Sequence, residues 1–268
     1  MEENQKEPVD FFAHQAQVKQ LLGDKEILLF LDYDGTLTPI VDTPDLAVIS
    51  DEMREQVRQA AQQIKTSIVS GRATDDVRSK VRLENIFYAG SHGFEIVDPQ
   101  GKVTINEEAQ KIRPVIDEVY ERLSQQLKKV PGSLVEHVKY TISVHYRLVA
   151  EKDFPAVQKA VADILTEYPV LRQTEGKKVF EVRPKIDWDK GRAVQWILKF
   201  LNFDPQKHLP VYIGDDTTDE DAFRFLANKG MGILVAQASR LSFAPYGVPD
   251  TPAVKRVLDF FMTGRKEA

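Results

Sequence analysis

Short apolar runs alternate with amphipathic stretches along much of the chain. The run 27–31 contains large apolar residues without a charge, and 86–89 and 210–213 are similar runs. Runs of this length are typical of strands that are buried on both faces of a parallel sheet. Between them, 53–64 and 193–201 carry apolar residues at helical spacing. The alternation of such strands and helices predicts a doubly wound, Rossmann-like α/β fold with a parallel sheet.

The pattern changes in the middle of the chain. Apolar and polar residues alternate one by one over 141–147 and 179–183, and these segments lie among helical stretches at 112–127 and 157–165. One-by-one alternation predicts strands with one buried and one polar face. Pro114 is expected to kink its helix or to start a new one. We therefore predict a small antiparallel α+β cap inserted into a larger core, with the core at 1–97 and 184–268 and the cap at 98–183.

Carboxylates, a hydroxyl group and a lysine occur near the ends of the predicted core strands. Asp32 and Asp34 follow directly on the first strand, and alternate residues of an extended segment point to the same side. Two carboxylates so close together repel each other unless one is protonated or a cation binds between them, and oxygen ligands suit Mg2+. Because such sheets bind ligands at the carboxyl ends of their strands, we expect one site here. Its further members are Ser70, Lys190, Asp215, Asp216 and Asp219.

Composition narrows the possible functions. The chain has 268 residues, 42% of them hydrophobic, which is enough for a large core. A formal net charge of −5 argues against a nucleic-acid partner bound by phosphate neutralisation. The absence of cysteine excludes disulfides, thiolate metal sites and cysteine nucleophiles. The sequence has no targeting pattern and no apolar run of membrane-spanning length, so we expect a cytoplasmic protein without a membrane partner.

The candidate residues suit phosphoryl chemistry without a glycine-rich phosphate-binding loop, since the chain has no such loop with its lysine and hydroxyl residue. A carboxylate can attack phosphorus to give an aspartyl-phosphate, while Mg2+ neutralises the phosphoryl oxygens and a lysine and a hydroxyl group hold the rest. The chemistry predicted for this site is therefore that of carboxylates and a metal ion.

Four motifs occur in a fixed order over nearly the whole chain: Asp32-Tyr33-Asp34-Gly35-Thr36, Ser70, Lys190 and Gly214-Asp215-Asp216-Thr217-Thr218-Asp219. With them the chain resembles the haloacid-dehalogenase-like (HAD) phosphatases. Within that superfamily, Val69-Ser70-Gly71-Arg72, His145-Tyr146-Arg147 and the position of the cap resemble the trehalose-6-phosphate phosphatases. The resemblance implies a Mg2+-dependent hydrolase of trehalose biosynthesis that converts trehalose 6-phosphate to trehalose and phosphate. Its implied partner is this small-molecule substrate, and we expect a monomer.

The resemblance implies a role for each motif. Asp32 is expected to be the nucleophile and a metal ligand. Asp34 is expected to protonate the leaving sugar oxygen, to deprotonate the attacking water and to reach the metal through its backbone carbonyl. Asp215 is the implied third ligand. The remaining residues are expected to orient the metal ligands (Asp216 and Asp219) or to bind phosphoryl oxygens (Ser70, Lys190 and Thr36).

The resemblance also assigns the polar face of the cap to the sugar. Bidentate arginine and paired carboxylates suit neighbouring hydroxyl groups. A solvated sheet face is the alternative, because alternation alone predicts polar residues on one side. The expected sugar-binding residues are Glu136, His145, Arg147, Lys177 and Glu181. The family usually has a lysine two residues after the glutamate that matches Glu136, whereas Val138 stands there in this chain and Lys139 follows.

Other interpretations stay open. His92 either hydrogen-bonds its own loop or takes part in catalysis, and Arg72 belongs either to the site or to the charged surface. Glu220 and Asp221 suit a helix N-terminus as well as a site. For the whole chain, the alternatives are another sugar phosphatase (for sucrose, glucosylglycerol or hexose phosphate), a sugar phosphotransferase or mutase, and a non-catalytic sugar-phosphate sensor.

Overall fold

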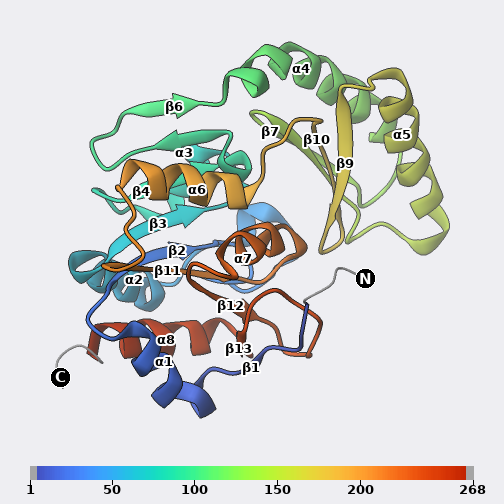
Figure 1. The fold of residues 1–268 in the computed structure, drawn as a ribbon. Helices are drawn as coiled ribbons and strands as arrows, with labels where there is room; N and C mark the ends of the chain where they lie inside the picture. The colour runs from blue at the N-terminus through green and yellow to red at the C-terminus, as the bar shows by residue number, and fades with distance from the viewer. Residues whose placement is uncertain (1–4, 264–268) are drawn as a thin grey trace.

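A nine-stranded sheet forms the centre of the larger part of the molecule (Figure 1). The structure is a computed structural model and describes residues 5–263. Neighbouring strands are parallel from one edge as far as β4, and the last two pairs are antiparallel. In spatial order the strands are β1 (Val9–Asp10), β13 (Tyr246–Val248), β12 (Met231–Val235), β11 (His208–Gly214), β2 (Glu26–Leu31), β3 (Lys65–Val69), β4 (Phe87–Gly90), β5 (Glu95–Val97) and β6 (Val103–Ile105).

Helices cover both faces of this sheet. Leu29 and Leu31 of β2 pack into one hydrophobic cluster with residues of α2 (Asp51–Gln63), α3 (Thr74–Val81) and α8 (Thr251–Thr263). Leu28 and Phe30 pack into a second cluster with residues of α6 (Lys190–Phe200) and α7 (Glu220–Leu226). Alternate residues of one strand are thus buried on opposite faces, as its unbroken apolar run predicts. The predicted α/β fold class is confirmed, and α1 (Gln15–Leu22) precedes β2 in the chain.

The strand order places a crevice where β2 and β11 end. From β2 the chain continues to β3 on one side of the sheet, whereas β12 follows β11 on the other side. Neighbouring strands whose connections leave in opposite directions open a gap at their carboxyl ends, where doubly wound folds bind ligands. The backbone N–H of Asp32 donates to the carbonyl of Ile213 at 2.9 Å, so the two strand ends are tied together.

A second, four-stranded antiparallel sheet forms the cap (Figure 1). Its strands, in spatial order, are β7 (Leu134–Val138), β8 (Thr141–His145), β10 (Val179–Pro184) and β9 (Leu171–Gly176). Ile142, Val144 and Phe180 pack with apolar residues of α4 (Glu107–Leu127) and α5 (Phe154–Glu167). The predicted alternation is therefore correct: one face of the sheet is covered by two helices, and the other face is polar.

Two local features differ from the sequence-based picture. Helix α4 begins after Asn106, whose side chain accepts a hydrogen bond from the Ala109 N–H at 3.0 Å, and it continues through Pro114. Pro114 therefore does not start a new helix. The turn at Asp98 joins β5 to β6, and both strands pair within the large sheet, so the division drawn at residue 98 falls inside this hairpin.

The edge strands β1 and β13 were not predicted, because two- and three-residue strands leave no periodic signal. Among residues 5–263, no helix has both the length and the apolar character needed to cross a bilayer.

Candidate active site

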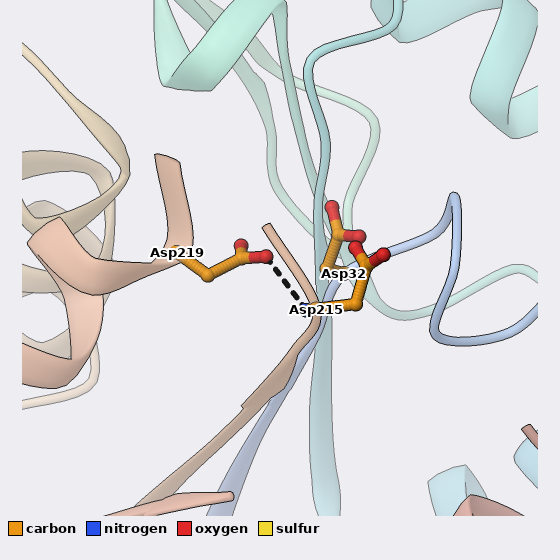
Figure 2. Close-up of side chains that lie close together, drawn as sticks. All are labelled: Asp32, Asp215 and Asp219. Atoms are coloured by element: carbon orange, nitrogen blue, oxygen red, sulfur yellow. Dashed lines mark hydrogen bonds between the residues drawn. The ribbon is translucent and has the colours of Figure 1, made fainter. Parts of the chain in front are cut away.

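Three carboxylates gather where β2 and β11 end (Figure 2). Asp32, Asp215 and Asp219 each offer an oxygen that lies within 4.8 Å of the others, and all three side chains are buried. In Figure 2 the carboxylates of Asp32 and Asp215 lie next to each other, and Asp219 approaches from the short helix that follows β11. Hard oxygen donors in this arrangement are suited to a divalent metal ion.

Gly35 is required for this arrangement. Its φ of 80° lies in the left-handed region, and the turn that it makes brings the chain after β2 against Asp215. A Cβ atom at position 35 would overlap the Asp215 carboxylate. A glycine here allows the carboxylate from β11 to approach Asp32, which supports the assignment of both residues to one ion site.

Asp219 holds the loop after β11 in place. Its carboxylate accepts hydrogen bonds from the Tyr212 hydroxyl group at 2.6 Å and from the backbone N–H groups of Asp215 and Asp216, both at 2.9 Å. Burial raises the pKa of Asp219, but Lys190 and these hydrogen bonds outweigh burial, so the pKa lies below its ordinary value. Asp219 is therefore an ionised residue that orients Asp215. Asp216 begins the short helix at Thr217–Asp219, with its side chain accepting from the Thr217 N–H at 2.8 Å.

Lys190 lies between Asp32 and Asp219 and binds both carboxylates. It is the first residue of α6, which Asp189 caps by accepting from the Arg192 N–H. Its ammonium group donates to Asp32 at 2.8 Å and to Asp219 at 2.7 Å, and the side chain is buried. Burial lowers the pKa of Lys190, but the two carboxylates outweigh that and raise it, so Lys190 is charged.

The positive charge near Asp32 and Asp215 is too small to offset the burial of these two carboxylates. Burial raises the pKa of Asp32 well above its ordinary value, although Lys190 lowers it in part. Burial likewise raises the pKa of Asp215 to about 7, against the effect of Lys177. A bound cation would favour the ionised form of both groups. The chemistry of this donor set therefore fits a divalent ion, with Asp32 and Asp215 as side-chain ligands.

The carboxylate of Asp34 is held apart from this group. Arg72 donates to it in a fork, Nε to Oδ2 and Nη2 to Oδ1, both at 2.7 Å. The same guanidinium group donates to Asp76 at 2.8 Å and to the Pro44 carbonyl at 2.8 Å. Because Arg72 is only 9% exposed, it belongs to the site and is not a surface charge. The predicted contribution of Asp34 to the metal is its backbone carbonyl, and this stays a prediction.

Ser70 and Thr36 are buried next to these motifs. The Ser70 hydroxyl oxygen accepts from the Arg72 N–H at 3.1 Å, which closes the turn at the end of β3. Among the described residues, the Thr36 hydroxyl group has no hydrogen-bond partner. Neither side chain lines the pocket described next, so their predicted contacts with phosphoryl oxygens stay predictions.

One pocket joins the core residues to the polar face of the cap. Its walls bring together ten of the residues expected at the site, from both parts of the chain. The core contributes Asp32, Asp34, Lys190, Asp215 and Asp216, and the cap contributes Glu136, His145, Arg147, Lys177 and Glu181. The polar cap face is therefore not simply solvated, because it forms a wall of the pocket that contains the carboxylates.

The cap residues also contact one another and the core. The Lys177 ammonium group donates to Asp215, and the Lys177 carbonyl accepts from Arg147 at 2.6 Å. His145 and Glu136 lie 3.1 Å apart. By contrast, Lys139 pairs with Glu95 of β5 at 2.6 Å and does not line the pocket, whereas Val138 does.

Glu181 is an ionised carboxylate inside the pocket. Its Oε2 atom lies 2.8 Å from Nε2 of His92, a residue of the core. Burial raises the pKa of Glu181, but His92, Arg183 and Lys190 outweigh burial and lower the pKa to about 2. A buried anion of this kind repels a phosphoryl group and accepts hydrogen bonds from hydroxyl groups.

Comparison with known families agrees with this site. The family model described as trehalose-phosphatase matches residues 30–250. The chain belongs to the trehalose-phosphatase family. It is 44% identical over 261 residues to trehalose 6-phosphate phosphatase RA3 of Zea mays, covering 91% of this chain and 72% of that protein. It is also 44% identical over 261 residues to a probable trehalose-phosphate phosphatase C of Arabidopsis thaliana, covering 93% and 82%.

Solved structures confirm the fold of this trehalose-phosphatase family member. A crystal structure described as a trehalose-6-phosphate phosphatase related protein superposes with a TM-score of 0.78, at 23% identity, over 91% of this chain and all of that chain (100%). A haloacid dehalogenase-like hydrolase from Bacteroides thetaiotaomicron superposes with a TM-score of 0.62, at 15% identity, over 88% and 99% of the two chains. The predicted HAD-like fold is therefore confirmed.

Several residues of this trehalose-phosphatase site were not predicted. Tyr212 lies in the middle of a strand, where an aromatic residue is expected for packing alone, yet its hydroxyl group binds Asp219. The loop after β2 lines the pocket through Ile40 and Pro44, and its irregular sequence gives no periodic signal. Glu220 accepts from Arg240 at 2.7 Å and from the Phe243 N–H at 2.9 Å. It therefore anchors a neighbouring loop, which agrees with the structural interpretation.

Proposed function

We propose that this chain is a Mg2+-dependent phosphatase that hydrolyses trehalose 6-phosphate to trehalose and phosphate. One observation carries the proposal: a single pocket has carboxylates and a buried lysine on its core side and hydrogen-bonding groups on its cap side. The first set suits a phosphoryl group and the second suits a polyhydroxylated leaving group. Family membership and the names of the relatives support trehalose as that leaving group.

The proposed reaction has two steps. In the first, a carboxylate oxygen of Asp32 attacks phosphorus, and the bond between phosphorus and the sugar oxygen breaks. Asp34, protonated and released from one of its two contacts with Arg72, gives its proton to that sugar oxygen. In the second, Asp34 takes a proton from water, which attacks the phosphorus of the aspartyl-phosphate and releases phosphate and free Asp32. The net reaction consumes one water molecule for each ester cleaved.

The other core residues stabilise the charges of this reaction or hold the groups that do so. Lys190, 2.8 Å from Asp32, favours the ionised form of the nucleophile and faces the negative charge that develops on the phosphoryl oxygens. Asp32, Asp215 and the carbonyl of Asp34 would hold Mg2+, which when bound supplies positive charge next to the phosphoryl group. Asp219 fixes the direction of Lys190, and Asp219 and Asp216 shape the loop that carries Asp215. Ser70 and Thr36 would add hydrogen bonds to phosphoryl oxygens.

The cap would recognise the sugar. We assign residues 98–183 to the cap and residues 1–97 and 184–268 to the core, as proposed from the sequence, except that strand β6 within the first range belongs to the core sheet. Glu136, His145, Arg147, Lys177 and Glu181 would bind hydroxyl groups of the leaving sugar, and closure would exclude water until that sugar departs. The proposal includes a monomeric state and a location in the cytoplasm.

A panel of phosphate esters tests the proposal. Purified protein with Mg2+ is incubated with trehalose 6-phosphate, sucrose 6-phosphate, glucosylglycerol phosphate and glucose 6-phosphate, and released phosphate is measured. We expect trehalose 6-phosphate to have the highest kcat/KM and Asp32→Asn to release phosphate at least about 10⁴-fold more slowly. A preference for a monosaccharide phosphate would exclude the proposed substrate. Transfer of the phosphoryl group to sugar, with no oxygen from labelled water in the phosphate, would indicate a mutase or phosphotransferase.

A further inference from the structure

Two consecutive residues after β4 have an unfavourable backbone conformation. Ser91 and His92, in the short helical turn Ser91–Gly93, have φ angles of 48° and 57°. Left-handed backbone is unfavourable for a residue other than glycine, and such strain persists where the surrounding structure holds the residue in place. Neither residue has a role in the proposed reaction.

Both side chains extend from this turn to the cap. The Ser91 hydroxyl group donates to the carbonyl of Val138, at the end of β7, at 2.8 Å. Nε2 of His92 lies 2.8 Å from Oε2 of Glu181 in β10, and His92 is only 2% exposed. The unusual backbone thus directs two neighbouring side chains toward two different cap strands.

The same turn is attached to the phosphoryl side of the site. The backbone N–H of Ser91 donates to the carbonyl of Arg72 at 2.7 Å, and that of His92 donates to the carbonyl of Ser70 at 2.9 Å. The residue between these two acceptors is Gly71, where a Cβ atom would lie 3.0 Å from Cε1 of His92 and 3.5 Å from Oε1 of Glu181. The missing side chain of Gly71 leaves the space in which His92 and Glu181 meet.

We propose that Ser91 and His92 form a docking element that places the cap carboxylate Glu181 for recognition of the sugar. His92 is then a positioning residue, which acts on the substrate only through Glu181. This inference rests on the proposed function, because it requires a leaving group that reaches the cap. It predicts that the docking element determines which esters are bound well and leaves the phosphoryl chemistry unchanged.

The test compares two substrates in His92→Gln. For trehalose 6-phosphate we expect kcat/KM to fall roughly 10–100-fold, mainly through a higher KM, since a misplacement of about 1 Å can cost this much. The leaving group of p-nitrophenyl phosphate has no sugar hydroxyl groups for the cap residues to bind. For this substrate we expect kcat/KM to change less than about threefold. His137→Gln is the matched control, because His137 pairs with Asp117 in the cap and does not line the pocket.

Two further variants keep the test decisive if His92→Gln is poorly folded. Ser91→Ala removes only the contact with Val138 and should shift the substrate ratio in the same direction by a smaller factor. Glu181→Gln should lower the kcat/KM for trehalose 6-phosphate. Adding His92→Gln to it should lower this kcat/KM little further, because both substitutions disrupt the same contact between His92 and Glu181. Thermal melting shows whether each variant is folded.

Three outcomes would overturn the inference: an equal loss for both substrates, no loss in folded His92→Gln, or additive losses in the double variant. Each of these leaves the proposed function standing, provided that the wild-type protein hydrolyses trehalose 6-phosphate. If the wild-type protein releases phosphate from p-nitrophenyl phosphate alone, the proposed function fails instead.

Discussion

The two walls of the pocket are built in different ways. On the core wall, Lys190 is fixed by two buried carboxylates, and its side chain is 3% exposed. On the cap wall, Lys177 also contacts a buried carboxylate, but it projects from a hairpin and its side chain is 45% exposed. Two lysines that each bind an aspartate of the same site therefore differ in how strongly the fold holds them.

This difference indicates that the two walls have different functions. Asp32 and Asp215 extend from the ends of strands that are paired on both sides, so their positions are set by the backbone of the sheet. The cap residues lie on the polar face of a smaller sheet, and their mutual contacts, such as that of Glu136 and His145, are partly exposed. Rigid placement suits one invariable chemical step, and adaptable contacts suit recognition of a sugar.

The largest expected effect is on the core wall. Asp32→Asn removes the nucleophile, and we expect kcat to fall about 10⁴-fold or more for trehalose 6-phosphate and p-nitrophenyl phosphate alike. Steady-state phosphate release from both esters measures this, with thermal melting as the control for folding. Residual activity within tenfold of the wild type would show that another group attacks phosphorus.

The two lysines give a direct test of the structural contrast. Lys190→Met leaves Asp32 and Asp219 buried without their cation, and we expect the free energy of unfolding to fall by roughly 3–5 kcal/mol. Lys177→Met removes a partly exposed pairing and should cost about 1 kcal/mol or less. Urea denaturation of both variants, in buffer with EDTA, measures the difference. Similar losses would contradict the contrast between the two walls.

A divalent ion should stabilise the core wall. Because the ion binds the folded chain, Mg2+ at about 100 times its dissociation constant should raise the free energy of unfolding by about 2.7 kcal/mol. Asp215→Asn removes one of the two clustered ligands and should abolish most of this gain. Calorimetric titration of both proteins with Mg2+ provides the comparison, and equal affinities would exclude Asp215 as a ligand.

The smallest effect on catalysis is expected at Lys139, outside the pocket. Lys139→Met leaves the buried Glu95 without its partner, so we expect a loss of about 1–3 kcal/mol in stability. The kcat/KM ratio of the two substrates should change less than about threefold, since Lys139 does not face the sugar side. A selective loss of trehalose 6-phosphate hydrolysis would instead place Lys139 among the sugar-binding residues.

The sequence predicted the fold and the site well where functional residues directly follow a regular apolar pattern. Apolar runs followed directly by carboxylates predicted both the central strands and the residues at their ends, because a buried strand and its ligand-binding tip are adjacent in the chain. The alternation at 141–147 likewise predicted which side chains face the pocket. In these places a local pattern is sufficient, since strand geometry alone decides where the side chains point.

Contacts between distant segments could not be predicted in this way. The fork from Arg72 to Asp34 and the meeting of His92 with Glu181 depend on how β3, β4 and the cap are arranged in space. The role of Tyr212 was hidden for a similar reason, because its hydroxyl partner lies beyond the end of its strand. Lys139 is close in sequence to Glu136, yet it pairs with the core, as only the register of the hairpin reveals.

The most direct test of the division between the two walls is a comparison of Asp215→Asn with Arg147→Gln, measured as kcat/KM for trehalose 6-phosphate and for p-nitrophenyl phosphate with Mg2+. We predict that Asp215→Asn lowers both values by the same factor. We predict that Arg147→Gln lowers only the value for trehalose 6-phosphate, by roughly 10–100-fold, as expected for lost contacts to the leaving group. Equal losses for both substrates in Arg147→Gln would contradict the account.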